Sequence, residues 1–234
     1  PQRYRQEVVA GPEHRALARL AAAQGMVLLR NAPVPPTSGH AAGPVLPLSS
    51  ATTSSVAVLG RLAAVPNLGD LGSSEVHPPS VVTPLEGIAA AGGWDGIDVR
   101  HHDGSDVDAA ASLAAACDVA VVVVGSDYQD EGEWIIRAGG DRVSLRLRES
   151  DQRLVEAAAR ANPRVAVVLM GGSAFVTDPW IHEVGAVLMA WYPGMEGGHA
   201  LADVLFGEVE PGGRLPCTWP TSTTSLPPFR RFTR

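Results

Sequence analysis

The stretch Val119-Ala120-Val121-Val122-Val123-Val124 decides the fold class. It is apolar at every position, whereas a strand with one face in water alternates apolar and polar residues, so it predicts a strand buried on both faces. Other strand-like runs rich in apolar residues occur at residues 56–59, 97–100, 165–170 and 187–191. Several such runs in one chain indicate a mainly parallel sheet that is covered on both sides.

Helical patterns separate these runs, as the crossover connections of a parallel sheet require. They lie at residues 84–91, 107–116 and 149–161, with a short one near 177–182 and another at 195–206. A last apolar run, 214–219, follows a turn too closely for a crossover helix, so we expect it to pair antiparallel at an edge. The predicted fold is a three-layer α/β/α sandwich with about six strands.

The rest of the chain divides by composition. Residues 1–31 contain a helical pattern and a short apolar run, which predict a helix and a strand leading into the domain. Residues 32–55 are rich in Pro, Ser and Gly, which favours a surface loop or linker. We therefore assign the sandwich domain to residues 56–220 and a tail to residues 221–234.

Composition excludes several classes of function. The net charge of −7 is spread along the chain without basic blocks, so neither nucleic acid nor a membrane surface is an expected partner. The chain contains no lysine, which phosphate-binding P-loops, Schiff-base enzymes and pyridoxal enzymes require. No stretch is long and apolar enough for a membrane helix, and no signal-peptide pattern begins the chain. No cofactor is expected.

Cysteine and histidine patterns give no metal site. We interpret Cys117 and Cys217 as two buried free thiols, because each lies beside or within an apolar run. The sequence His101-His102-Asp103 follows a strand-like segment without a second ligand cluster, so we expect a solvated loop there.

Loops at the C-terminal ends of parallel strands are where functional groups gather. The loop 125–134 follows the most apolar run and carries four carboxylates, a phenol and an indole, with no basic residue before Arg137. Crowded carboxylates raise one another's pKa, which lets a carboxylic acid stay protonated and donate a proton. Aromatic rings can stack on a sugar, although a plain acidic surface loop would have the same composition.

Two other loops are interpreted as structural, with no catalytic role. The loop 69–74 has two glycines but not the G-x-G-x-x-G spacing of a dinucleotide site, so a hydrogen-bonding polar loop is expected. The loop 191–198 opens a helix, where Glu196 would serve as a cap. Ser173 follows a strand without the G-x-S-x-G pattern of a serine hydrolase.

Taken in order, several motifs resemble the second domain of family 3 glycoside hydrolases over nearly the whole chain. They are His14-Arg15-Ala16-Leu17-Ala18-Arg19, Val27-Leu28-Leu29-Arg30-Asn31, Leu46-Pro47-Leu48, Val56-Ala57-Val58-Leu59-Gly60, Gly69-Asp70-Leu71-Gly72-Ser73-Ser74, Val82-Thr83-Pro84-Leu85-Glu86-Gly87-Ile88, Asp130-Glu131-Gly132-Glu133, Gly140-Asp141-Arg142, the run 191–198, Ala202-Asp203-Val204-Leu205-Phe206-Gly207 and the run 211–220. Each motif alone is weak, but their common order is specific.

The resemblance implies a β-glucosidase-like retaining hydrolase of β-glucosides, in which a (β/α)₈ barrel supplies the nucleophilic aspartate. This domain would deliver the acid/base glutamate. By motif that residue is Glu131, with Glu133 as the competitor. Trp134, Tyr128 and Asp70 are candidates for binding substrate.

Two further segments of this region have assigned roles that are not catalytic. Asp141 and Arg142 would form a structural ion pair that anchors the loop. Ser126-Asp127-Tyr128 superficially resembles the nucleophile signature of the family but stands in the wrong domain, so we assign no nucleophile to this chain.

The barrel is absent from the 234 residues, so we expect a piece of a longer or separately encoded protein that needs a barrel in cis or trans for activity. Two alternatives remain open. One is a non-catalytic module of the same fold that binds sugar or forms a subunit interface. The other is a β-xylosidase or arabinosidase of the same family.

Overall fold

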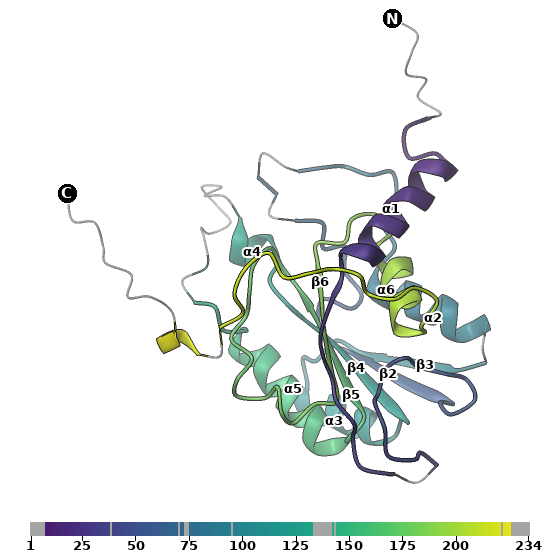
Figure 1. The fold of residues 1–234 in the computed structure, drawn as a ribbon, viewed down its shortest axis with the longest axis vertical. Coiled ribbons are helices and arrows are strands. Elements are labelled where there is room, and N and C mark those ends of the chain that lie inside the picture. Colours follow the sequence, from purple (N-terminus) through teal and green to yellow (C-terminus); the bar gives the residue numbers. More distant parts are fainter. Residues whose placement is uncertain are drawn as a thin grey trace, which may run out of the picture.

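The computed structural model describes residues 8–37, 39–69, 71–72, 75–94, 96–132, 142, 144–220 and 222–225. Helices are interspersed with strands along the chain (Figure 1), although no helix of the described residues separates the first two strands or the last two. In order they are α1 (Pro12–Gly25), β1 (Val27–Asn31), β2 (Ser55–Leu59), α2 (Pro84–Trp94), β3 (Asp98–His102), α3 (Val107–Ala115), β4 (Val119–Gly125), α4 (Tyr128–Glu131), α5 (Glu149–Ala161), β5 (Val165–Met170), β6 (Ala186–Trp191), α6 (Gly197–Leu205) and the 3₁₀ helix η2 (Thr223–Ser225).

The sheet has six strands in the order β1-β6-β5-β4-β2-β3. The pairs β2–β3, β2–β4, β4–β5 and β5–β6 are parallel, whereas β1 runs antiparallel to β6 with Val27 opposite Met189. Every residue of β4 is buried, in agreement with its uninterrupted apolar run. The predicted class, a mainly parallel α/β/α sandwich with an antiparallel edge strand, is confirmed.

Helices cover both faces of the sheet. Along β4, Val119, Val121 and Val123 belong to one buried cluster, and the intervening residues belong to the other. Helices α1, α2 and α6 pack together on the first side, and α3 packs against α5 on the second (Figure 1). Because side chains alternate along a strand, a strand that is apolar throughout supplies both clusters at once.

Glycines at the C-terminal ends of the strands bring the loops together. Gly60, after β2, and Gly125, at the end of β4, have φ of 107° and 138°, which side-chain-bearing residues rarely adopt. A Cβ atom on Gly125 would lie 2.0 Å from the carbonyl oxygen of Met170, and one on Gly60 would lie 2.3 Å from that of Val123. These glycines therefore allow the backbone to turn tightly beside the neighbouring strand.

The predicted edge strand 214–219 is wrong. This segment has no regular secondary structure, and β1 already occupies the free edge of β6. The backbone N–H of Gly213 donates instead to the carbonyl of Met26 at 3.0 Å, and Leu215 and Trp219 pack against the second cluster.

Three smaller predictions also need correction. The helix expected near 177–182 is a series of turns over residues 178–183, anchored by the fully buried Trp180. His101 and His102 lie within β3, where the ring Nδ1 of His101 is 2.8 Å from the carbonyl oxygen of Val58. Both cysteines are free as expected, but only Cys117 is buried and Cys217 is exposed.

The segment 32–55 contains no helix among its described residues, and only its last residue belongs to a named strand, yet it is packed against the domain. Val34, Val45, Leu46 and Leu48 are buried in the first cluster. The side chain of Asn31 donates to the carbonyl of Leu46 at 2.8 Å and accepts from its N–H at 3.3 Å. The loop is thus an integral part of one face.

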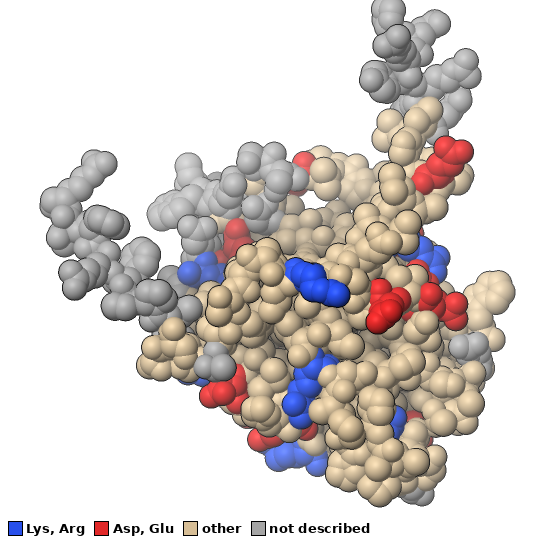
Figure 2. Space-filling view, in the orientation of Figure 1, with Lys and Arg blue, Asp and Glu red and all other residues tan. Residues whose placement is uncertain are grey.

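The surface carries charges of both signs. Figure 2 shows basic and acidic side chains interspersed on the face drawn, with most of that face formed by other residues. Within the described part of the chain, no helix has both the length and the apolar character needed to cross a membrane.

Candidate active site

The acidic loop after β4 folds into one helical turn, α4, because its aspartates cap it. The side chain of Asp127 accepts from the N–H of Gln129 at 2.8 Å, and the side chain of Asp130 accepts from the N–H of Asp127 at 3.1 Å. This reciprocal capping box satisfies backbone donors that a helix start leaves free. Glu131 is the last residue of the turn.

Three hydrogen-bond donors and one arginine surround the carboxylate of Glu131. Its Oε2 accepts from the backbone N–H of Gly172 at 2.7 Å and from the hydroxyl of Tyr192 at 2.5 Å. Its Oε1 forms an ion pair with the Nε of Arg142 at 3.1 Å and accepts from the hydroxyl of Ser173 at 3.4 Å. The side chain is 12% exposed. The ends of β4, β5 and β6 therefore meet at this one carboxylate.

Arg142 is fixed from several sides. Its guanidinium lies 4.5 Å from the ring centre of Phe175 and donates to the hydroxyl of Ser126 at 3.2 Å and to the carbonyl of Ala174 at 2.7 Å. Burial lowers the pKa of Arg142, and the charge of Glu131 opposes that shift. The predicted partner, Asp141, lies outside the described residues, so Glu131 is the carboxylate that the structure places beside Arg142.

Tyr192 stays a neutral phenol. Burial raises its pKa well above the usual value, and its hydrogen bond to Glu131 raises the pKa further. A neutral hydroxyl can either donate or accept a hydrogen bond.

Two arginines neutralise the aspartates of the acidic loop. Arg148 donates to Asp130 at 2.9 Å and to Asp127 at 3.0 Å, and Arg61 pairs closely with Asp127. The expectation that no basic residue lies near these carboxylates is therefore wrong, because folding brings in Arg61, 66 residues from Asp127, and Arg148, 18 residues from Asp130. Burial raises the pKa of the nearby Asp151, while the charge of Arg61 opposes that shift.

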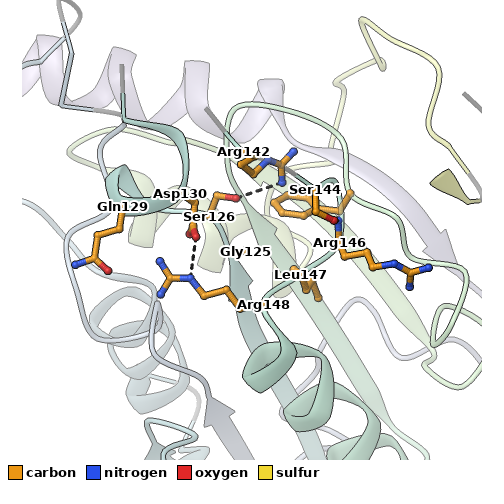
Figure 3. Close-up of a pocket in the computed structure, with 10 residues that line it drawn as sticks. Gly125, Ser126, Gln129, Asp130, Arg142, Ser144, Arg146, Leu147 and Arg148 are labelled. Carbon is orange, nitrogen blue, oxygen red and sulfur yellow. Dashed lines mark hydrogen bonds and ion pairs between the residues drawn. The ribbon is translucent and has the colours of Figure 1, made fainter. Parts of the chain in front are cut away.

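A cavity of about 320 Å³ opens beside α4. Figure 3 shows Arg142 and Arg148 reaching Ser126 and Asp130 from opposite sides of it. A neighbouring groove of about 530 Å³ is lined by Tyr128, Arg61 and the loop after β2.

The structure places only some of the predicted site residues. Glu131 lies at the strand ends with its side chain 12% exposed, and Tyr128 is 38% exposed and lines the groove. Glu133, Trp134 and Asp70 lie outside the described residues.

Sequence reasoning missed other members of the site. Gly172, Ser173 and Tyr192 contact Glu131, and Arg61 and Arg148 hold its turn. Tyr192 and Ser173 lie in loops that follow strands, so the rule of strand ends could have found them.

Glu196 does not cap α6. It occupies the N-cap position but makes no capping hydrogen bond; its carboxylate pairs with Arg15 at 2.7 Å and with the Nδ1 of His199 at 2.8 Å. Burial alone would raise the pKa of Glu196, but the bonds from His199 and Arg15 outweigh it and lower the pKa. Glu196 therefore joins α1 to α6.

Among the described residues, no three His, Cys, Asp or Glu side chains gather in a group that could hold a metal ion.

A model of the glycosyl hydrolase family 3 C-terminal domain matches residues 26–234. Thermostable β-glucosidase B of Acetivibrio thermocellus is 37% identical over 229 residues, which cover 94% of this chain and 28% of that protein. β-Xylosidase/α-L-arabinofuranosidase 1 of Medicago sativa subsp. varia is 35% identical over 220 residues, 90% of this chain and 26% of that protein.

Solved structures agree with these relatives. The β-D-glucoside glucohydrolase of Trichoderma reesei superposes with a TM-score of 0.78 at 29% identity, covering 92% of this chain and 31% of that one. The chain spans less than a third of the length of these relatives. Because the family model and the relatives cover most of the sequence, this chain belongs to glycosyl hydrolase family 3, to the C-terminal domain of that family.

Proposed function

We propose that this chain is the acid/base-bearing domain of a retaining β-glycosidase of the β-glucosidase type, with Glu131 as the acid/base. The relatives named β-glucosidases support the reaction class. The position of Glu131 at the meeting point of three strand ends supports the residue, because ligand sites of open parallel sheets lie there.

The partners of Glu131 carry the argument. Two of them, Tyr192 and Ser173, are hydroxyls that can turn from donating to accepting. An acid/base residue changes between carboxylic acid and carboxylate in each catalytic cycle, so its surroundings must accommodate both forms. A pocket made only of cations and backbone N–H groups would accommodate the carboxylate alone.

A retaining mechanism needs a second carboxylate, roughly 5–5.5 Å from the first, that attacks the anomeric carbon. The aspartates closest in sequence, Asp127 and Asp130, are engaged by Arg61 and Arg148 and cap α4, so they are unsuited to that role. In our proposal a (β/α)₈ barrel, in the same polypeptide or supplied separately, provides the nucleophile and most contacts to the sugar.

Glu131 protonates the departing oxygen in the first step and activates water in the second. In the described conformation its contacts are three hydrogen-bond donors and the cation of Arg142. The acid step therefore requires one carboxylate oxygen to turn from its donors toward the leaving group.

The test compares Glu131→Gln with Glu133→Gln in a protein that contains this chain and a barrel. The substrates are an activated aryl β-glucoside and an unactivated disaccharide. A good leaving group needs little protonation, so Glu131→Gln should lose about 100-fold more kcat/KM on the disaccharide than on the aryl glucoside. If Glu133→Gln shows that selectivity and Glu131→Gln does not, the role passes to Glu133.

A β-xylosidase or arabinofuranosidase is the second candidate, favoured by the relative from Medicago sativa subsp. varia, which is named for both activities. Aryl β-glucoside, β-xyloside and α-arabinofuranoside given to the same protein distinguish the two. If kcat/KM is higher on a pentoside than on the glucoside, the proposed specificity changes from glucoside to pentoside. The proposed role of Glu131 is then unaffected.

A further inference from the structure

A compact group of five charged side chains lies beneath the turn that carries Glu131. We call it the α4 clamp; it consists of Arg61, Asp127, Asp130, Arg148 and Asp151. Arg148 bonds both aspartates of the turn, at 2.9 and 3.0 Å. Arg61 pairs with Asp127 and lies 3.6 Å from both Asp130 and Asp151.

The clamp fastens α4 to three other elements. Arg61 follows β2 closely, Arg148 is the N-cap residue of α5, and Asp151 lies in the first turn of α5. Arg61 also donates to the carbonyl of Gly125 at 2.7 Å, at the end of β4. The guanidinium groups of Arg61 and Arg148 thus connect the turn to the ends of β2 and β4 and to the start of α5.

These ion pairs are more shielded than surface pairs usually are. The side chains of Asp127, Asp130 and Asp151 are 17%, 20% and 5% exposed, and those of Arg61 and Arg148 are 26% and 32% exposed. An isolated surface pair contributes little, but a network of pairs with several bonds per guanidinium has fixed geometry.

α4 depends on such support because it is a single turn of four residues. One helical turn fixes several backbone dihedral angles for very few hydrogen bonds and is unstable by itself. The N–H groups of Asp130 and Glu131 both bond the carbonyl of Asp127 at 3.0 Å, so displacement of Asp127 would also move the backbone of Glu131.

We propose that Arg61 and Arg148 are positioning residues for the reaction, which act on Glu131 through the backbone of α4. Among the described residues, their side chains contact the aspartates of the clamp and Gly125, not the carboxylate of Glu131. The proposal rests on the proposed function of Glu131 and adds what holds that residue at its place. A misplacement of about 1 Å can cost on the order of 100-fold in rate.

The first experiment uses this chain without any substrate. In Arg148→Gln, the amide protons of Asp130 and Glu131 should exchange with solvent at least ~10-fold faster, because the open turn becomes more populated. The control is Arg153→Gln in the same helix, whose side chain is 64% exposed and lies 3.9 Å from Glu149. Unchanged exchange in β5 shows that the variant is folded.

The second experiment measures kcat and KM with the barrel present, on the disaccharide and the aryl glucoside. Arg148→Gln should lose about 100-fold in kcat on the disaccharide, less than ~10-fold on the aryl glucoside, and change KM by less than ~2-fold. General destabilisation would lower kcat by the same factor on both substrates. Arg148→Lys, which keeps the charge, should recover part of the loss on the disaccharide.

If Arg148→Gln does not fold, Arg148→Lys and Arg61→Lys replace it, because an ammonium cannot bridge two carboxylates as a guanidinium does. Each variant should lose about 10-fold in kcat on the disaccharide and show no such loss on the aryl glucoside. The positioning role is overturned if these variants lose kcat by the same factor on both substrates. It is also overturned if their activity equals that of Arg153→Gln.

Glu131→Gln in the same assays separates the two proposals. If it loses equally on both substrates, the acid/base role fails and the positioning role with it. If Glu131→Gln is selective for the disaccharide while Arg148→Gln matches Arg153→Gln, only the positioning role is refuted.

Discussion

Replacing Tyr192 by phenylalanine removes one of the two donors to Oε2 of Glu131 and preserves the ring. A hydrogen bond to a charged group contributes about 1.5–3 kcal/mol net. Glu131 keeps two other donors and the ion pair with Arg142, and the phenylalanine ring has no hydroxyl that burial would desolvate. We therefore expect the lower part of that range, about 1.5–2 kcal/mol, as the loss in free energy of unfolding.

The assay is denaturation of the 234-residue chain by urea and by heat. For a chain of this length, 1 kcal/mol corresponds to about 2–4 °C in Tm, so the variant should melt about 3–8 °C lower. Tyr128→Phe is the matched control, because Tyr128 is 38% exposed and its hydroxyl makes a 3.5 Å bond to Gln129. It should stay within about 0.5 kcal/mol of wild type.

A double-mutant cycle with Glu131→Gln assigns the effect to this contact. In the Glu131→Gln background, Tyr192→Phe should cost about 1 kcal/mol less than in wild type, since the amide forms the weaker, uncharged bond. Equal costs in both backgrounds, or a loss no larger than that of Tyr128→Phe, would refute the reasoning.

Two further predictions concern stability. The folded pKa of Glu196 lies below its ordinary value of 4.5, so the stability it contributes is present above pH 4.5 and is lost as the pH falls through the lower folded value. Glu196→Gln should thus cost about 1.5–3 kcal/mol at pH 7, and urea titrations below about pH 4 should show the gap closing; a constant gap contradicts the shift. Gly125→Ala should cost about 3 kcal/mol or more in a urea titration, because the new Cβ would lie 2.0 Å from the carbonyl oxygen of Met170 at a φ of 138°. Gly93→Ala, with open space around its Cβ, should stay within about 1 kcal/mol of wild type, and equal effects of the two alanines would contradict the steric argument.

The elements of the sheet could be predicted where local chemistry alone decides them. The predicted bounds 165–170 and 149–161 coincide with those of β5 and α5, because an unbroken apolar run and a strongly amphipathic pattern are both local signals. The prediction for residues 214–219 failed because β1, another apolar segment, pairs with the edge of β6 instead. Tertiary packing, which local sequence does not show, decides which of the two segments takes that edge.

The candidate site was less predictable because its contacts are long-range. The family resemblance predicts Glu131, but Tyr192 and Gly172, which contact it, are 61 and 41 residues away in the sequence. Arg61 is likewise 66 residues from Asp127 in the sequence. A count of charges within the acidic loop therefore gave the wrong electrostatic environment, since the neutralising arginines come from the starts and ends of other elements.

A long-range contact also decides the role of Glu196. Glu196 looked like a cap because it precedes a helix, yet its partner Arg15 is 181 residues away and engages its carboxylate instead. The preference for Glu131 over Glu133 stays a prediction, since Glu133 lies outside the described residues.

The pairing of β1 with β6 has a consequence for how the domain forms. Val27 lies opposite Met189, so this edge of the sheet forms only when two segments 162 residues apart in the sequence come together. Contacts of such sequence separation carry a large loop-closure entropy and slow folding. During synthesis, β6 emerges long after β1, which leaves β1 without its partner while residues 32–185 are made. A truncation that removes residues 1–31 would expose the backbone of β6 as an open edge, and we expect such a fragment to self-associate.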